Sequence, residues 1–240
     1  MSKSNSMLRL DKYLADLSVG TRTEVKQMIR KGRVMVNGDT ILVPETKVDC
    51  NFDKISVDGR ELSYVHMEYF MLNKPAGVVS ASSDKKQTTV VDLIDEAKRK
   101  DLFPVGRLDK DTEGLLIITN DGDLAHQLLS PKKHVDKVYF ARLREPLSKK
   151  EEEAFAAGLK IDEEFTALPA ILKRVSEREA YVTIREGKFH QIKRMFEAVE
   201  NEVVYLKRIS MGSLILDESL SLGEYRELTK EELDALRQYK

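Results

Sequence analysis

The segment 106–123 holds more acidic residues and glycines than any other stretch of the chain, so it is the first place to look for chemistry. Its side chains allow a cation site, because four residues have the spacing of positions 1, 3, 5 and 6 of an EF-hand calcium loop: Asp109, Asp111, Glu113 and Gly114. Two features argue against a calcium site. The last ligand position of the loop holds Asn120 instead of a glutamate. The residues after Gly114 also have the apolar pattern of a strand instead of an exiting helix.

Two other interpretations of the same segment remain open. Residues 120–123 have the composition of a turn, and Asp123 is placed to cap a helix that follows it. In the other interpretation, a single carboxylate flanked by basic residues serves as a nucleophile or general base, because nearby cations keep a carboxylate ionised. The spacing alone does not rank Asp109 above Asp111 for this role.

Histidine and cysteine, the other common metal ligands, are few. The histidines His66, His126 and His134 show no ligand spacing with one another. Cys50 is the only cysteine, which excludes an internal disulfide and a cysteine-based zinc cluster and fits a reducing cytoplasm. We therefore predict no bound metal and a cytoplasmic protein.

The 240 residues are nearly electroneutral, with 40 Lys and Arg against 41 Asp and Glu and a formal net charge of −1. This average conceals a basic head, because residues 1–40 hold eight basic and four acidic side chains, while residues 215–240 hold four basic and seven acidic ones. No apolar run approaches the ~18 residues that a membrane helix needs, so we expect no membrane partner.

The basic head is expected to contain two helices. An apolar stripe at Leu10, Leu14 and Leu17 predicts the first helix. The second is predicted from about Thr21 to a stop at Gly32, and basic residues recur along one of its faces, at Arg22, Lys26, Arg30 and Arg33. A basic stripe of this kind is suited to a nucleic-acid backbone, although it is also what an ordinary solvated helix face looks like.

Strands and turns follow these helices. Residues 34–36, the turn Asn37-Gly38 and residues 40–43 predict a hairpin. Beyond a domain boundary near residue 62, apolar runs predict strands at 70–72, 77–79, 114–119, 138–143, 180–184 and 213–216. Helices are predicted near 90–99, 123–129, 148–157 and 189–199. Strands mixed with helices in this irregular order predict an α+β fold with a mixed, largely antiparallel sheet flanked by helices.

The head resembles the S4 RNA-binding domain over residues 8–55. The similar stretches are Leu10–Leu14, Thr23–Ile29 and Gly32–Gly38. The resemblance implies an RNA partner but no reaction. It also implies that basic residues of the head contact RNA, and the candidates are Arg9, Lys12, Arg22, Lys26, Arg30 and Arg33.

Three later stretches resemble, in the same order, the motifs of the RsuA-type pseudouridine synthases. Leu72–Ser80 is similar to the first motif, Gly106–Leu116 to the catalytic-aspartate motif, and Glu186–Phe196 to the third. Together with the head, the resemblance spans nearly the whole chain. It implies an S4 domain with a short linker at residues 1–62 and a pseudouridine synthase catalytic domain at residues 63–240.

The resemblance also implies roles for single residues. Asp109 matches the catalytic aspartate and is the implied nucleophile. Tyr139 matches the tyrosine that lies against the target base, and Lys193 the basic residue that pairs with the catalytic aspartate. His190 is implied to have a structural part. Further contacts with the RNA are expected from Lys74, Arg107 and Arg194.

The implied activity is isomerisation of a specific uridine to pseudouridine in 16S rRNA, on a flipped-out nucleotide. Lys193 followed by Met195-Phe196 resembles the branch that acts on the small subunit. The reaction changes no redox state, so no cofactor is expected, and we expect a monomer that meets 16S rRNA or a pre-30S particle. Three alternatives stay open: the same reaction on 23S rRNA, a non-catalytic S4-type ribosome-assembly protein, and a carboxylate hydrolase or metal enzyme that uses Asp109 and Asp111.

Overall fold

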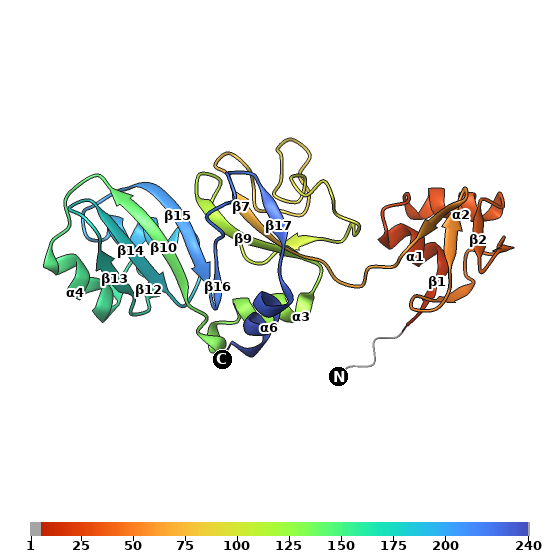
Figure 1. Ribbon diagram of the computed structural model, residues 1–240. Helices are drawn as coiled ribbons and strands as arrows, with labels where there is room; N and C mark the ends of the chain where they lie inside the picture. The colour runs from red at the N-terminus through yellow and green to blue at the C-terminus, as the bar shows by residue number, and fades with distance from the viewer. Residues whose placement is uncertain (1–5, 240) are drawn as a thin grey trace. The chain divides into compact units, whose positions relative to one another are not determined.

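The computed structural model describes residues 6–239 and divides into two compact units (Figure 1). The small unit contains the described residues up to Glu68 and, in addition, the segment Glu96–Asp101. The large unit contains Tyr69–Asp95 and the chain from Leu102 onward. The first break in the chain thus falls after Glu68, beyond the boundary expected near residue 62. Residues 1–5 of the expected S4 domain lie outside the described residues.

Two helices form one layer of the small unit: α1 (Leu10–Asp16) and α2 (Arg22–Arg30). Thr21 and Glu24 form a capping box at the start of α2. The helix ends at Arg30, and Gly32 adopts a left-handed φ of +72°. Arg33 therefore lies outside the helix, which corrects the expectation that it belongs to the basic stripe of α2.

A four-stranded antiparallel sheet forms the other layer, with strand order β3-β2-β5-β6. Its strands are β2 (Val34–Val36), β3 (Asp39–Thr40), β5 (Ile55–Val57) and β6 (Arg60–Leu62); β1 (Met7–Arg9) pairs separately with β4 (Lys47–Asp49). Asn37 and Gly38 both have positive φ, +52° and +91°, as a type I′ turn requires, so the predicted hairpin is present. Its second strand is shorter than predicted. Buried apolar residues of α1, α2, β2, β4 and β5 form the core of this unit.

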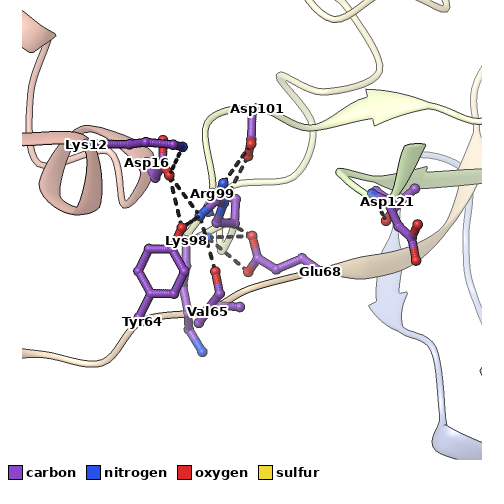
Figure 2. Close-up of polar contacts among 10 residues, drawn as sticks. Lys12, Asp16, Tyr64, Val65, Glu68, Lys98, Arg99, Asp101 and Asp121 are labelled. Carbon is purple, nitrogen blue, oxygen red and sulfur yellow. Dashed lines mark hydrogen bonds and ion pairs between the residues drawn. The ribbon is translucent and has the colours of Figure 1, made fainter. Parts of the chain in front are cut away.

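The segment Glu96–Asp101 is attached to the small unit through a buried arginine (Figure 2). The guanidinium of Arg99 donates two hydrogen bonds to Asp101 and one, of 2.7 Å, to the hydroxyl of Tyr64. The carboxylate of Glu68 accepts the backbone N–H groups of Lys98 and Arg99. These N–H groups bond to a side chain instead of helical carbonyls, so the helix predicted near 90–99 is wrong and the segment consists of turns.

The large unit is built on a nine-stranded mixed sheet. The strands along its main path follow the order β13-β14-β10-β15-β9-β7-β17. Only β15 and β9 run parallel, and every other neighbouring pair of this sheet in the described chain is antiparallel. The bounds are β7 (Tyr69–Lys74), β8 (Phe103–Pro104), β9 (Glu113–Thr119), β10 (Lys137–Leu143), β13 (Ile171–Arg174), β14 (Glu179–Ile184), β15 (Val203–Met211), β16 (Leu214–Ile215) and β17 (Tyr225–Glu227). This confirms the predicted α+β class and largely antiparallel sheet.

The helices of the large unit are α3 (Gly122–Leu129), α4 (Lys149–Ala157), α5 (Gln191–Glu197) and α6 (Lys230–Gln238), with a short 3₁₀ turn at Pro131–Lys133. The first three confirm predicted helices, whereas α6 was not predicted. Asp121 caps α3 by accepting the N–H of Leu124 at 3.0 Å, so the cap is Asp121 and not Asp123. A small hairpin pairs β11 (Leu159–Lys160) with β12 (Thr166–Ala167).

Helices α3 and α6 lie side by side and pack on the sheet (Figure 1). Leu124 and Leu128 of α3 and Leu236 of α6 share one apolar cluster with Leu115 and Ile117 of β9. No helix within residues 6–239 is long and apolar enough to cross a membrane.

The sequence prediction missed the longest strand, β15. It alternates buried residues with half-exposed and exposed ones and carries two basic residues, so it lacks the continuous apolar run that marked β9. The expected strand at 77–79 is reduced to an isolated bridge between Val79 and Thr89.

Candidate active site

The loop that precedes β9 is held from within by Lys74. The side chain is fully buried, and its Nζ donates to the backbone carbonyl oxygens of Pro75, Asp109, Lys110 and Thr112 at 2.9–3.3 Å. Burial lowers the pKa of Lys74 to about 8, against the opposing effect of nearby carboxylates. Lys74 was expected to contact RNA. In the structure its buried ammonium contacts the backbone of the loop that carries Asp109.

The other end of this loop is fixed by a close approach of two strands. Gly114 has φ +99°, and a Cβ at this position would lie 2.2 Å from the carbonyl oxygen of Arg208. Gly114 and Arg208 are register partners in the parallel β9–β15 pair. Only glycine fits here, because both the left-handed φ and the missing side chain are required. The end of the loop that carries Asp109 is thereby held at a defined position of β15.

Asp109 lines a cavity of about 880 Å³ and its side chain is 24% exposed. The Nζ of Lys193, on α5, lies 3.3 Å from Oδ2 of Asp109 and 2.6 Å from Oδ1 of Asp111. One ammonium thus serves two carboxylates, and its hydrogen bond lowers the pKa of Asp111. Asp111 is 73% exposed, whereas Asp109 turns toward the cavity. The two aspartates therefore differ in exposure, a difference that their spacing did not show.

An exposed aromatic pair stands beside Asp109. Nε2 of His190 lies 3.6 Å from Oδ1 of Asp109, and its ring stacks on that of Phe189 with centroids 3.8 Å apart and an interplanar angle of 18°. Phe189 is 72% exposed and lines the cavity. Sequence reasoning did not single out Phe189; an aromatic residue between basic and histidine neighbours in a glycine-containing loop was the available signal.

The loop that carries this aromatic pair is ordered by buried polar groups. Nε2 of Gln191 donates to Oε1 of Glu186 at 2.8 Å, and the same oxygen accepts the N–H of Leu168. Oε1 of Gln191 accepts the N–H of Lys188 at 3.0 Å. Both side chains are almost fully buried. The exposure of Phe189 is therefore a property of a fixed loop.

The cavity wall opposite the loops is formed by strands β10 and β15. Tyr139, on β10, is 7% exposed and is the register partner of Arg208 on β15. The pairing shifts between Val138 and Tyr139, as at a β-bulge, a feature that often directs side chains into sites. Lys137 also lines the cavity, and burial lowers its pKa to about 8. Lys137 and Arg208 were not predicted as site residues, and Arg208 lies on β15, the strand that the sequence prediction missed.

The other two predicted RNA-contact residues of the large unit, Arg107 and Arg194, have different surroundings. Arg107 is exposed at the cavity. Arg194 forms an ion pair with Asp162, and its guanidinium lies 5.8 Å from the ring centroid of Phe165, so its charge is paired outside the cavity lining. Lys193, and not Arg194, is the basic residue beside Asp109.

Several basic residues of the small unit are neutralised by acids. Arg9 pairs with Asp11 and Glu45, Lys12 with Asp16, and Arg33 with Asp58. Lys26 lies 3.8 Å from Asp11. Arg22 and Arg30 are exposed and form no ion pair within the part of the chain that the structure describes. Of the six residues expected to contact RNA, these two are therefore the most available for phosphate.

The arrangement is suited to a carboxylate that acts as a nucleophile. A carboxylate beside a lysine lines a cavity with a tyrosine on one wall, and a cavity of this size accepts a nucleotide. Among residues 6–239, no cluster of three or more His, Cys, Asp or Glu side chains is arranged to hold a metal ion. Gly114 leads into strand β9 and not into the helix that an EF-hand requires.

Known proteins resemble this chain over nearly its whole length. Residues 68–198 match the family model described as RNA pseudouridylate synthase, and residues 8–51 match the S4 domain. The uncharacterized RNA pseudouridine synthase YtzG of Bacillus subtilis is 47% identical over 236 residues, covering 96% of this chain and 99% of that protein. Ribosomal small subunit pseudouridine synthase A of Escherichia coli (strain K12) is 39% identical, covering 94% and 98%.

A solved structure agrees with these sequence relatives. The crystal structure of a pseudouridylate synthase superimposes with a TM-score of 0.68 at 37% identity, covering 95% of this chain and 99% of the other. The family match covers more than half of the chain, and the relatives share both units. The chain therefore belongs to the RNA pseudouridine synthase family, as an RsuA-type member with an S4 domain ahead of its catalytic domain.

Proposed function

We propose that this enzyme isomerises one uridine of 16S rRNA to pseudouridine, with Asp109 as the residue that acts on the sugar. The observation that carries the proposal is a partly buried carboxylate at a nucleotide-sized cavity with an ammonium 3.3 Å away. A carboxylate that lies beside a lysine at such a cavity is placed to act on a nucleotide as a nucleophile or a base. The S4 domain supports an RNA substrate.

The reaction breaks the bond between C1′ and N1 of the uridine and joins C1′ to C5. Asp109 either attacks C1′ to form an ester or takes a proton from C2′ to leave a glycal. The base then turns and C5 bonds to C1′. On the ester route this step breaks the bond between C1′ and the carboxylate of Asp109, and on the glycal route Asp109 returns its proton to C2′. The proton lost from C5 is balanced by one gained at N1, so no oxidant, reductant or cofactor takes part.

The substrate nucleotide has to leave its stack to reach Asp109. Extruding a base costs a few kcal/mol. Stacking on an aromatic side chain returns about 1–3 kcal/mol per base, and Tyr139 on the cavity wall is the residue proposed to supply it. Stacking uses the face of the ring, so this role needs no proton transfer by Tyr139.

The choice of 16S rRNA rests on the relatives. Proteins from Vibrio and Escherichia that are 39–41% identical to this chain are named ribosomal small subunit pseudouridine synthase A. We propose the corresponding substrate here, as free 16S rRNA or a pre-30S particle in the cytoplasm, bound by a monomer. Exposed Arg22 and Arg30 on the small unit provide phosphate contacts that need no carboxylate to be displaced.

The test is release of tritium from C5-tritiated uridine, because forming the C5–C1′ bond expels that hydrogen. Wild-type protein is expected to release tritium from 16S rRNA or a pre-30S particle. Asp109→Asn should abolish release, whereas Asp111→Asn, the matched control that also removes a carboxylate next to Lys193, should retain it.

Other results of the tritium-release assay would favour one of the alternative functions. Release only from 23S rRNA would move the target to the large subunit. Binding of 16S rRNA without any release would make the chain a non-catalytic assembly protein. Full activity of Asp109→Asn would remove this residue from the mechanism.

A further inference from the structure

Arg208 is a buried cation that the mechanism above does not use. The residue is 2% exposed. Its Nε donates to the carbonyl oxygen of Leu115 at 2.7 Å, and its Nη2 is buried without a hydrogen-bond partner within residues 6–239. The structure shows no carboxylate paired with Arg208 among those residues. The guanidinium therefore keeps a free donor inside the protein.

Such an arrangement is costly to the fold. A buried donor without an acceptor loses its hydration and gains nothing in return, and the loss is larger for a charged group. Replacing a buried charge by an apolar side chain of similar volume is often neutral or stabilising. The hydrogen bond to Leu115 satisfies only one of the three nitrogens of the Arg208 guanidinium. Each unsatisfied buried donor calls for an explanation, and a role in catalysis is one.

The position of Arg208 indicates which part of a substrate it would meet. Arg208 and Tyr139 are register partners on neighbouring strands, so their side chains share one face of the sheet, and both line the cavity. Asp109 is more exposed than either residue. When the carboxylate of Asp109 reaches the sugar and the base lies against Tyr139, the edge of the base is the part next to Arg208.

We infer that the terminal nitrogens of Arg208 donate to a carbonyl oxygen of the target uracil and stabilise the base as an anion. The inference rests on the proposed function. When the C1′–N1 bond breaks, its electron pair stays on uracil, and the charge is shared among N1, O2 and O4. This holds for both routes through Asp109. When C5 bonds to C1′ and loses its proton, the base becomes neutral and the contact weakens.

A donor aimed at charge that develops during the reaction acts mainly on the rate. Removing one such donor lowers kcat by about 100- to 1,000-fold in other enzymes. Affinity for a large RNA depends mostly on phosphate contacts. Arg208→Ala is therefore expected to lower kcat for tritium release from 16S rRNA by about 100- to 1,000-fold. The Kd for 16S rRNA, measured in the Asp109→Asn background, should change by less than about threefold.

The same substitution also removes the bond to Leu115, so a second measurement separates chemistry from folding. Ethylguanidinium added at millimolar concentration should restore part of the activity of Arg208→Ala, because it supplies the missing donor in the space left behind. Ethylammonium and urea, which lack either the fork of donors or the charge, should not. Arg142→Ala is the matched control, because Arg142 lies on β10 with its side chain 55% exposed and does not line the cavity.

Each possible result of these experiments supports or overturns a specific claim. Arg208→Ala with a rate within about threefold of wild type, while Asp109→Asn is inactive, overturns the inference and leaves the proposed function standing. Loss of activity that ethylguanidinium does not restore overturns it as well, and assigns Arg208 to the β9–β15 junction alone. Activity of Asp109→Asn would instead overturn the proposed function. A low rate with unchanged Kd and rescue by ethylguanidinium alone supports the inference.

Discussion

Replacing Lys74 with methionine tests whether a buried ammonium organises the catalytic loop. Methionine keeps most of the length of the side chain and removes its three N–H donors. The carbonyl groups that lose a donor belong to Pro75 and to three residues around the proposed nucleophile: Asp109, Lys110 and Thr112. The loop is then free to shift while the core around Lys74 remains filled.

The structure predicts a small change in stability and a large change in rate. The lowered pKa of Lys74, about 8 instead of 10.5, corresponds to about 3 kcal/mol against the charged form. Methionine removes this penalty. Each carbonyl left without a donor costs about 1–3 kcal/mol when it stays dry, and water can reach those of the exposed Lys110 and half-buried Asp109. The two effects largely cancel, and we expect the free energy of unfolding to change by less than about 2 kcal/mol.

For the rate of tritium release, we expect no second effect that offsets the loss of the Lys74 hydrogen bonds. A displacement of about 1 Å in a catalytic group lowers the rate by about 100-fold. We therefore expect Lys74→Met to release tritium from 16S rRNA about 100-fold more slowly than wild type, with denaturant unfolding measured on the same preparation. Lys110→Met, an exposed lysine of the same loop that bonds to Gln87, is the control and should be near wild type. The reasoning is refuted if Lys74→Met keeps its full rate, or if its loss of activity only follows the fraction unfolded.

Three further predictions follow from the same geometry. The free energy of unfolding of wild type relative to Lys74→Met should rise between about pH 8 and 10.5, because the unfolded chain then binds more protons at Lys74 than the folded one; a flat difference would contradict the lowered pKa. Gly114→Ala should lower stability by more than about 3 kcal/mol in thermal unfolding, since a Cβ meets backbone at 2.2 Å, while Gly122→Ala, in open space, should not. Phe189→Trp introduces the sole tryptophan of the chain, and 16S rRNA should quench its fluorescence if a base stacks there; Phe189→Ala should weaken binding by about 1–3 kcal/mol.

Much of the architecture was readable from local patterns. The apolar run at 114–119 predicted β9, and the Asn37-Gly38 pair predicted a turn whose residues both have positive φ. Helices α3, α4 and α5 were also predicted near their observed positions, although the cap of α3 is Asp121 and not Asp123. These features depend on side chains a few residues apart, so the sequence contains the information in one place. The helix expected near 90–99 failed because a distant carboxylate, Glu68, takes its N–H groups.

By itself, the sequence determined the family resemblance and the segment that carries Asp109, because those depend on residue order alone. Only the tertiary structure decided which charges are available. It places the buried Lys74 beside four backbone carbonyls, and it places Arg208 at the cavity with a free donor. Burial and charge pairing depend on contacts between residues far apart in the chain, which no local pattern records. The site is therefore a product of the β9–β15 junction as much as of its motif.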